Sequence, residues 1–419
     1  MTAAALTSSD VAAVAITTVR TDDTGPLIDR LPTEGALSWV RRGEGLIGCG
    51  EAARLEVSGP GALAEAAAWW AAYTASADID DPVGVPGSGP VLFASIAFDP
   101  TAGTSVFVVP EVTVGRRDGV SWLTTVGDAT PTAPAPLTDD DEPLRLRYAD
   151  GALDPASWCS AVGAAVQRIT AGELEKVVLA RDLLVAADRP LDPRHLLRRL
   201  AVRFPDCWTF AVDGLLGATP ELLLRRTGRT LSARVLAGTA PRGAGADDDR
   251  LARQLMGSAK DRAEHELAVD SLVEALAPFC STLTAPPEPE LLTLANVRHL
   301  ATDVVGTQRA RGPRSRAGLL ELVGAVHPTA AVCGTPRPLA AAVIGELEGM
   351  DRGRYAGPVG WLDGRGDGEF GLALRCAELT GDRGARLFAG CGIVSGSDPS
   401  AELAETQAKF AAFQAALEG

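Results

Sequence analysis

Strand-like segments that turn back on themselves at short turns constrain the fold of this chain most. Three segments of this kind are expected to be hairpins, at residues 209–219, 222–236 and 355–377. The first turns at Asp213-Gly214, a pair of residue types that tolerates the positive φ of a tight hairpin turn. The second turns near Gly228, and the third turns around the glycines at positions 364, 366 and 368. Segments paired in this way predict mainly antiparallel sheet.

Further strands and several helices are expected around these hairpins. Asp154-Pro155 has the residue types of a helix N-cap followed by proline at the first helical position, and apolar residues then recur at helical spacing. Helices are also expected at 251–276 and 399–417, and strands at 91–98, 104–114, 176–181 and 387–394. Strands and helices in this order indicate the α+β class.

Proline-rich and acidic segments mark the expected loops. Pro131 to Pro136 followed by Asp139 to Glu142 favours a surface connection, because prolines and like charges both disfavour packing. We expect it to join an N-terminal part, residues 1–130, to the region at 145–419 that carries the chemical motifs, within one unit spanning 1–419. Two shorter loops are expected at 243–249 and 285–289.

The charge and the cysteines exclude several classes of protein. A formal net charge of −15 argues against sequence-independent binding of nucleic acid, since such binding depends on Lys and Arg facing phosphates. The seven cysteines are scattered and never spaced as C-x-x-C, which disfavours a disulfide framework or a zinc site. The N-terminal segment lacks the basic start of a signal peptide, and the apolar stretch at 61–77 is too short to cross a bilayer. A cytoplasmic protein without membrane or nucleic-acid partners is therefore expected.

Two acidic pairs are candidates for a metal site. Asp261 and Glu264, and likewise Glu402 and Glu405, are spaced i, i+3, which places both carboxylates of a pair on one face of a helix. Two such helices facing each other would supply four hard oxygen donors, which suit Mg²⁺ held together with waters and an anionic substrate. The alternative, which is the commoner situation for such pairs, is that both are solvated helix faces, and composition alone does not decide.

Lys176 and Glu221 are candidates for proton transfer. Lys176 begins a β-rich segment, where a lysine is usually an exposed edge residue; the alternative is a buried, neutral lysine that accepts a proton. Glu221 follows a proline in apolar surroundings, so it is either a turn residue or a carboxyl group whose raised pKa suits a general acid.

Four further residues are candidates for contact with an anionic ligand. Gly390 and Gly392 lie in a strand-like segment, where glycine indicates close approach of the backbone to a ligand or to a neighbouring strand. Arg375 and Lys409 are candidate clamps for a carboxylate, although each taken alone is equally well explained as a surface charge.

An ordered series of motifs runs from residue 158 to the C-terminus. They are Glu-Lys-Val-Val-Leu-Ala-Arg181, Ala-Thr-Pro-Glu221, Leu-Ala-Gly-Thr239, Lys-Asp-Arg-Ala-Glu-His265, His-Pro-Thr329, Arg-Tyr-Ala-Gly-Pro-Val-Gly-Trp361, Ala-Leu-Arg375, Ala-Gly-Cys-Gly-Ile-Val394 and Ser-Asp-Pro-Ser-Ala-Glu-Leu-Ala-Glu-Thr406. Together they resemble the chorismate-utilising enzymes, which comprise isochorismate synthases, salicylate synthases and the large subunits of anthranilate and aminodeoxychorismate synthases. Each motif is weak alone, and their joint occurrence in this order carries the resemblance.

The resemblance implies a fold and a set of site residues. The fold would be an α/β sandwich of two large packed antiparallel sheets with helices outside. Mg²⁺ would be bound by Glu264 and Glu405, with Asp261 and Glu402 supporting it through water, and would hold the ring carboxylate of chorismate. The residues that match substrate-binding positions of the family are Tyr355, Arg375, Gly390, Gly392 and Lys409, with Thr239 and His299 lining the pocket.

Three positions distinguish the chemistries within the resembled family. Members that use ammonia typically have glutamine at the position of Lys176, whereas lysine suits the activation of water. Aminodeoxychorismate synthases often carry a nucleophilic lysine where this chain has Ala237, so the covalent route is closed here. Salicylate synthases typically have threonine at the position of Ala331, and alanine there is similar to enzymes that stop at isochorismate.

The resemblance therefore predicts an isochorismate synthase, an isomerase in which Lys176 activates water for attack at C2 of chorismate and Glu221 protonates the departing C4 hydroxyl. The alternatives are a salicylate synthase, an ammonia-using large subunit with a glutaminase partner, and a catalytically silent chorismate-binding protein. No glutaminase subunit is expected, and the protein is expected to be a monomer or a homodimer. The sequence leaves open whether the product enters menaquinone, siderophore or salicylate-derived metabolism.

Overall fold

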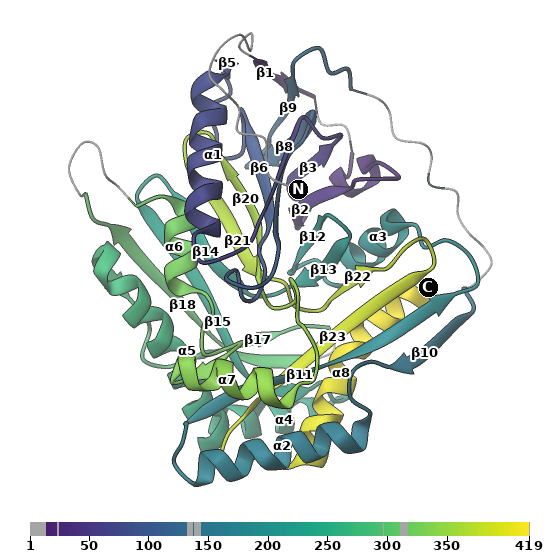
Figure 1. The fold of residues 1–419 in the computed structure, drawn as a ribbon, viewed down its shortest axis with the longest axis vertical. Coiled ribbons are helices and arrows are strands. Elements are labelled where there is room, and N and C mark those ends of the chain that lie inside the picture. Colours follow the sequence, from purple (N-terminus) through teal and green to yellow (C-terminus); the bar gives the residue numbers. More distant parts are fainter. Residues whose placement is uncertain are drawn as a thin grey trace.

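Two large β-sheets and the helices around them make up the described part of the chain (Figure 1). The structure is a computed structural model that describes residues 14–22, 25–131, 137, 144–295, 297–310 and 317–418. Strands from the N-terminal and C-terminal regions enter both sheets.

The larger sheet has thirteen strands among the described residues. Its order is β10 (Leu146–Asp150), β11 (Lys176–Ala187), β23 (Gly384–Ile393), β22 (Cys376–Leu379), β13 (Leu215–Thr219), β12 (Trp208–Val212), β2 (Leu37–Arg41), β3 (Glu44–Cys49), β8 (Val112–Arg117), β9 (Val120–Val126), β1 (Ala15–Thr21) and β5 (Asp78–Asp80). The short strand β19 (Gly334–Thr335) pairs with the first residues of β11. Neighbouring strands are antiparallel, except that β1 and β5 are parallel.

The smaller sheet has ten strands among the described residues, and its paired strands are antiparallel. Its order is β16 (Cys280–Thr284), β18 (Val297–Gln308), β15 (Thr230–Pro241), β14 (Leu222–Thr227), β21 (Gly368–Leu372), β20 (Pro358–Asp363), β6 (Val91–Ser95), β7 (Ser105–Val109) and β4 (Ala53–Val57), with β17 (Glu290–Thr293) beside β18. The long strands β15 and β18 pair with each other, and helix α5 (Ala259–Leu276) packs against both.

The helices lie around the outside of the sheets (Figure 1). They are α1 (Ala62–Ser76), α2 (Pro155–Thr170), α3 (Pro193–Arg203), α4 (Ala246–Gly257), α5 (Ala259–Leu276), α6 (Leu319–Val326), α7 (Arg337–Leu347) and α8 (Pro399–Glu418), with short 3₁₀ segments η1 (Leu27–Arg30) and η2 (Ala277–Phe279). Helix α5 packs against β15, and α8 packs against β23. Among the described helices, none has the length and apolarity needed to cross a bilayer.

A continuous cluster of buried side chains joins the two sheets. Trp39 on β2 and Phe210 on β12 enter it from the larger sheet, and Phe93 on β6 and Phe370 on β21 enter it from the smaller one. Trp39 also donates from Nε1 to Oε2 of Glu369 on β21, at 3.1 Å. Each sheet therefore buries one face against the other, as in a β-sandwich.

The expected fold class and most expected elements are confirmed. The three hairpins form, and Asp154 caps α2 by accepting hydrogen bonds from the backbone N–H groups of Ala156 and Ser157. The loop at 285–289 lies between β16 and β17. The connection expected at 131–142 lies largely outside the described residues, as do residues 1–13 of the N-terminal segment.

Three expectations are wrong. The single strand expected at 104–114 is two strands in different sheets, because β7 ends at Val109, before Pro110, and β8 begins at Val112. The single helix expected at 251–276 is two helices, because Ser258 ends α4 and caps α5 by accepting a hydrogen bond from the backbone N–H of Asp261. The loop expected at 243–249 ends at residue 245, because α4 begins at Ala246. The aspartates at 247–249 occupy the first turn of α4, where the helix dipole favours negative charge.

Candidate active site

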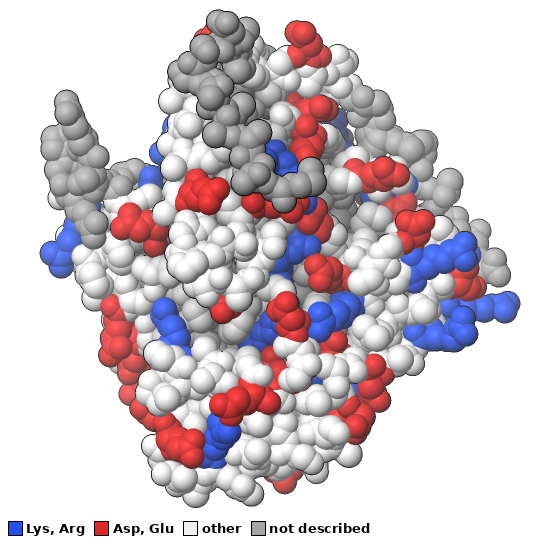
Figure 2. Space-filling model, viewed as in Figure 1, with Lys and Arg blue, Asp and Glu red and all other residues white. Residues whose placement is uncertain are grey.

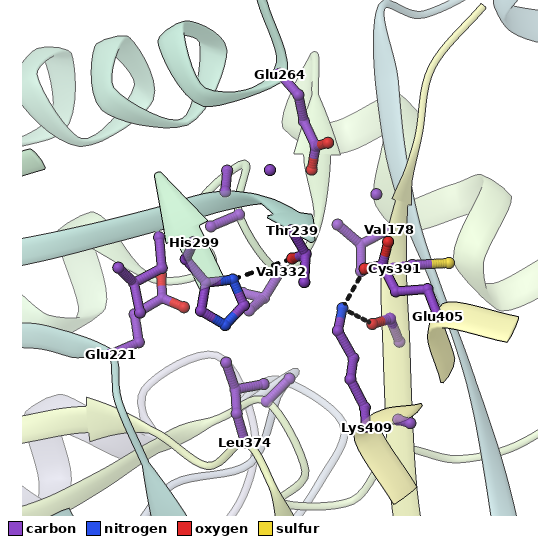
Figure 3. A pocket seen from close by; sticks show the side chains of 18 of the residues that line it. Val178, Glu221, Thr239, Glu264, His299, Val332, Leu374, Cys391, Glu405 and Lys409 are labelled. Atoms are coloured by element: carbon purple, nitrogen blue, oxygen red, sulfur yellow. Dashed lines mark hydrogen bonds and ion pairs between the residues drawn. The ribbon is translucent and has the colours of Figure 1, made fainter. Parts of the chain in front are cut away.

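One cavity collects the predicted site residues from elements far apart in the sequence. Its lining includes Glu221, Thr239, Asp261, Glu264, His299, Ala331, Tyr355, Arg375, Gly390, Gly392, Glu402, Glu405 and Lys409. Figure 3 shows Glu221 and His299 at one side of the cavity and Glu405 and Lys409 at the other. Lys176 is the one predicted site residue that is not part of the lining, and it lies directly behind the wall.

Helices α5 and α8 bring the two acidic pairs to the same cavity. Glu402 is only 4% exposed, so the interpretation as a solvated helix face is wrong for this residue. Burial raises the pKa of Asp261, and the negative charges of Glu264 and Glu405 raise it further, although its hydrogen bond with Ser258 acts in the opposite direction. The carboxylates thus repel one another, and a bound cation would relieve that repulsion.

Lysines pair with the carboxylates in this structure. The Nζ atoms of Lys176, Lys260 and Lys409 lie 3.1, 3.0 and 2.6 Å from Glu264, Glu402 and Glu405, respectively. Within the described ranges, no three His, Cys, Asp or Glu side chains converge as a ready-made metal cluster. Mg²⁺ does not require one, because it is usually held by one or two carboxylates together with waters and substrate oxygens.

The donor set therefore fits Mg²⁺, and the backbone beside it supports the fit. A Cβ atom at Gly392 would lie 2.2 Å from Oε1 of Glu264, so glycine at this position leaves room for the carboxylate. Hard oxygen donors and two glutamates from facing helices match the requirements of this ion. The assignment of Glu264, Glu405, Asp261 and Glu402 to the metal stays a prediction.

Lys176 is buried at the first residue of β11, with no exposed surface. Strands β19 and β23 flank this end of β11, so the interpretation as an exposed edge lysine is wrong. Nζ lies 3.1 Å from Oε1 of Glu264, yet it has no hydrogen-bond partner of good geometry in the described structure. Burying an amine without a hydrogen-bond partner costs free energy. A water or substrate atom that accepts a hydrogen bond from Nζ would recover part of this cost.

Glu221 occupies the turn between β13 and β14 and is 5% exposed. Burial raises its pKa from 4.5 to about 8, while the backbone of Leu236 and the charges of Lys176, Lys409 and Arg375 act in the opposite direction. The carboxyl group is therefore mostly protonated at neutral pH. A protonated carboxyl at a cavity wall can donate a proton to a leaving group.

A chain of polar contacts lies beside Glu221. Arg375 donates from its NH2 to Nε2 of His299 at 2.9 Å, so Nδ1 carries the proton of the neutral imidazole. Nδ1 lies 3.0 Å from Oγ1 of Thr239, to which it donates (Figure 3). Burial, followed by the charge of Arg375, lowers the pKa of His299 well below its usual value. His299 therefore orients Arg375 without adding charge.

The opposite wall is formed by β23 and α8. Nζ of Lys409 donates to the backbone oxygen of Gly390 at 2.7 Å, and Tyr355 stacks on Phe388 with ring centroids 4.8 Å apart. A Cβ atom at Gly390 would lie 3.2 Å from the Tyr355 hydroxyl. Glycine thus leaves both the backbone and the hydroxyl close to the cavity. Cations, a hydroxyl group and exposed backbone suit an anionic substrate.

The comparison with known proteins identifies the family. The sequence profile of the family described as chorismate binding enzyme matches residues 34–418. The chain belongs to this family. Its match covers the N-terminal strands from β2 onward as well as the region that carries the motifs, while β1 lies before it.

Relatives of this chorismate binding enzyme include named isochorismate synthases. Isochorismate synthase DhbC of Bacillus subtilis is 42% identical over 61% of this chain and 66% of its own. Isochorismate synthase EntC of Escherichia coli is 36% identical over 77% of this chain and 79% of its own. The structure of MenF, the menaquinone-specific isochorismate synthase of Escherichia coli, matches with a TM-score of 0.81 and 26% identity, covering 98% of this chain and 96% of that one.

Among the lining residues of this chorismate binding enzyme that the sequence did not point to, three have charged or aromatic side chains: Lys260, Arg352 and Phe388. Lys260 directly precedes Asp261, so its place in the acidic motif was a usable signal. Phe388 lies two residues before Gly390, and the two-residue period of a strand places both on one face. Nothing in the local sequence around Arg352 indicates that it reaches the site.

Proposed function

We propose that this chain is a Mg²⁺-dependent isochorismate synthase, which isomerises chorismate to isochorismate. The observation that carries the proposal is the presence of Glu221 in the wall of the cavity and of Lys176 directly behind that wall, against Glu264. Lys176 is a buried amine without a hydrogen-bond partner in the described structure, and Glu221 is a buried carboxyl group with a pKa of about 8. A proton acceptor and a proton donor of this kind are what an exchange of hydroxyl groups requires.

The reaction needs one proton transfer at each side of the ring. Lys176, in its neutral form, takes a proton from a water molecule whose oxygen bonds to C2. The ring double bonds shift, the C4–O bond breaks, and Glu221 protonates the departing hydroxyl so that it leaves as water. Atoms balance, because one water enters and one leaves. Transfers of this kind typically contribute about 10²- to 10⁴-fold each.

The other lining residues bind the two carboxylates of chorismate. Arg375, oriented by His299, and Lys409, held at the backbone oxygen of Gly390, are two of the cations that line the cavity. Tyr355 presents a hydroxyl group next to Gly390. Glu264 and Glu405, supported by Asp261 and Glu402, would hold Mg²⁺, which supplies positive charge for the ring carboxylate and so offsets the acidic helices.

Two cavity residues distinguish this proposal from other activities of the family. Ala237 lines the cavity, and its methyl group offers no nucleophile for a covalent intermediate. Ala331 lines the cavity as well, so no hydroxyl group is available from that position for a subsequent elimination of pyruvate. Together with Lys176 in the place of proton acceptor, they favour an enzyme that works without a glutaminase subunit and stops at isochorismate.

Product identification tests the proposal. Purified protein, chorismate and Mg²⁺ are incubated with and without EDTA, and the products are separated by chromatography. We expect isochorismate, and we expect its formation to stop with EDTA and to return when Mg²⁺ is added in excess. Salicylate with pyruvate would indicate a salicylate synthase, and an amine formed only with ammonium would indicate an aminating enzyme. Either product, or unchanged chorismate, would contradict the proposal.

A further inference from the structure

Within the described residues, 178–182 of β11 have no strand beside them on one edge. Strand β19 pairs with residues 176 and 177, and β10 pairs with residues 183–187, so a gap of a few residues separates the two. Strand β23 pairs with β11 along its other edge, and helix α7 packs against β11 near the gap. Buried backbone groups in such a gap need other partners, because unpaired N–H and C=O groups are costly.

Side chains and a loop satisfy this edge in place of a strand. The C=O of Val178 accepts a hydrogen bond from NH2 of Arg352 at 2.9 Å, and the N–H of Ala180 donates to Oε1 of Glu348 at 2.7 Å. The N–H of Val178 donates to the backbone oxygen of Cys333 at 2.7 Å. Glu348 and Arg352 therefore hold the segment of β11 that follows Lys176.

Glu348 and Arg352 form one buried ion pair just beyond α7, with 2% and 4% exposure. Nε of Arg352 donates to Oε2 of Glu348 at 2.9 Å, and its NH2 pairs with Oε1. The guanidinium lies over the ring of Phe98, 4.2 Å from the centroid. Its NH1 donates to the backbone oxygen of Val332 at 2.8 Å. A single guanidinium thus ties β11 to the segment that contains Val332.

Both segments tied by Arg352 belong to the cavity. Val178 lines it from β11, and Ala331 and Val332 line it from the segment after α6, as does Arg352 itself. Lys176 lies two residues before Val178 on the same edge of the strand. A buried ion pair is weak evidence for stability, because desolvating two charges offsets most of their attraction. Stability alone therefore does not explain a pair at this place.

We propose that Glu348 and Arg352 are positioning residues, which fix Lys176 relative to the wall that carries Ala331. This inference rests on the proposed function, in which Lys176 accepts the proton of the attacking water. Arginine is required because its planar fork reaches Glu348 and two backbone oxygens at once, which the ammonium of a lysine does not reproduce. A displacement of about 1 Å at a reacting group costs about 10²-fold in rate.

The test compares two conservative variants with two matched controls. Arg352→Lys and Glu348→Gln loosen the positioning pair, whereas Arg117→Lys and Glu369→Gln alter another buried glutamate with its arginine. Arg117 pairs with Glu369 at 2.8 Å, and neither lines the cavity. For each variant, kcat and KM for chorismate and the melting temperature are measured next to the wild type.

We expect kcat to fall by about 10- to 100-fold in Arg352→Lys, with KM within threefold of the wild type. Glu348→Gln should show the same pattern, and both control variants should keep kcat within threefold of the wild type even where they melt earlier. Unchanged kcat in Arg352→Lys, or equal losses in its control, would overturn the inference. If neither Arg352→Lys nor Glu348→Gln folds, the pair is structural and the inference fails. A wild type that does not consume chorismate contradicts the proposed function itself, and the inference fails with it.

Discussion

The substitution Glu221→Gln removes the acidic proton of Glu221 and keeps the shape of its side chain. The amide has nearly the same size as the protonated carboxyl group but has no proton of comparable acidity to give to the leaving hydroxyl. If Glu221 is the general acid, kcat should fall by about 10²- to 10⁴-fold, which corresponds to about 3–5 kcal/mol in the activation barrier. In the wild type, kcat/KM should decline above about pH 8, where the carboxyl group with a pKa of about 8 ionises.

The same variant should gain stability at alkaline pH. Burial raises the pKa of Glu221 from 4.5 to about 8, so between these pH values the folded chain keeps a proton that the unfolded chain loses. The stability of the wild type therefore falls as the pH rises through this window, by an upper limit of about 5 kcal/mol. Glutamine does not ionise, so Glu221→Gln escapes this loss above pH 8 and shows no such advantage below about pH 4.5.

Glu369→Gln is the matched control for this effect. Glu369 is also buried, but the charges of Arg225 and Arg117 outweigh burial and lower its pKa. A carboxyl group of this kind stabilises the fold above its unfolded pKa, and the contribution is lost as the pH falls. Glu369→Gln should therefore destabilise the protein at neutral pH, with the opposite sign to Glu221→Gln.

Denaturant unfolding between pH 4 and 9, together with steady-state kinetics, provides the assay for both glutamates. The unfolding free energy of each variant is compared with that of the wild type at each pH. A Glu221→Gln enzyme that keeps wild-type kcat would refute the role as general acid. A difference in unfolding free energy that does not change between pH 4.5 and 8 would refute the raised pKa.

Three further predictions concern Glu264 and the two residues next to it, Lys176 and Gly392. Lys176→Gln should abolish isochorismate formation while chorismate still binds in a Mg²⁺-containing buffer, as checked by calorimetry; retained turnover would remove Lys176 from its role. Gly392→Ala should lower activity at least tenfold, because the new Cβ would lie 2.2 Å from Oε1 of Glu264. The control is Gly163→Ala in α2, where a new Cβ meets no atom within 4 Å; this variant should keep its activity and gain about 0.5–1 kcal/mol of stability. Equal activities of the two variants would contradict the close approach. Glu264→Gln should weaken Mg²⁺ binding in calorimetric titration at least tenfold, and unchanged affinity would exclude Glu264 as a ligand.

Elements whose signals are local could be predicted from the sequence. Asp154-Pro155 predicted the start of α2 because the cap needs only its own helix, and Asp213-Gly214 predicted its hairpin because the turn needs only positive φ. The boundary between α4 and α5 also has a local signal, because Ser258 is a usual N-cap residue. The helical composition on both sides of Ser258 nevertheless predicted one continuous helix.

Features that depend on tertiary packing could not be predicted in this way. The spacing of Glu402 and Glu405 places them on one face of a helix, but only the packing of α8 against β23 turns that face toward α5 and the cavity. The edge-strand interpretation of Lys176 was wrong because β19 and β23 cover both sides of its strand. Arg352 acts across a gap in the sheet, and no pattern in its neighbourhood indicates that gap.

Acidic and basic side chains are interspersed on the molecular face drawn in Figure 2, in a chain that is acidic as a whole. Lys176, Lys260, Arg375 and Lys409 gather at the cavity although the chain as a whole carries a net charge of −15. The protein field outside the cavity would therefore repel a dianionic substrate, and binding has to come from close contacts within the site.

The central claim is that a water molecule activated by Lys176 supplies the new hydroxyl group. Turnover of unlabelled chorismate in ¹⁸O-enriched water, followed by mass spectrometry of the product formed before equilibrium is reached, tests this claim most directly. We expect one ¹⁸O atom in each isochorismate molecule, located at the C2 hydroxyl. Isochorismate without the label would mean that the hydroxyl moves within the substrate, and the roles given to Lys176 and Glu221 would be wrong.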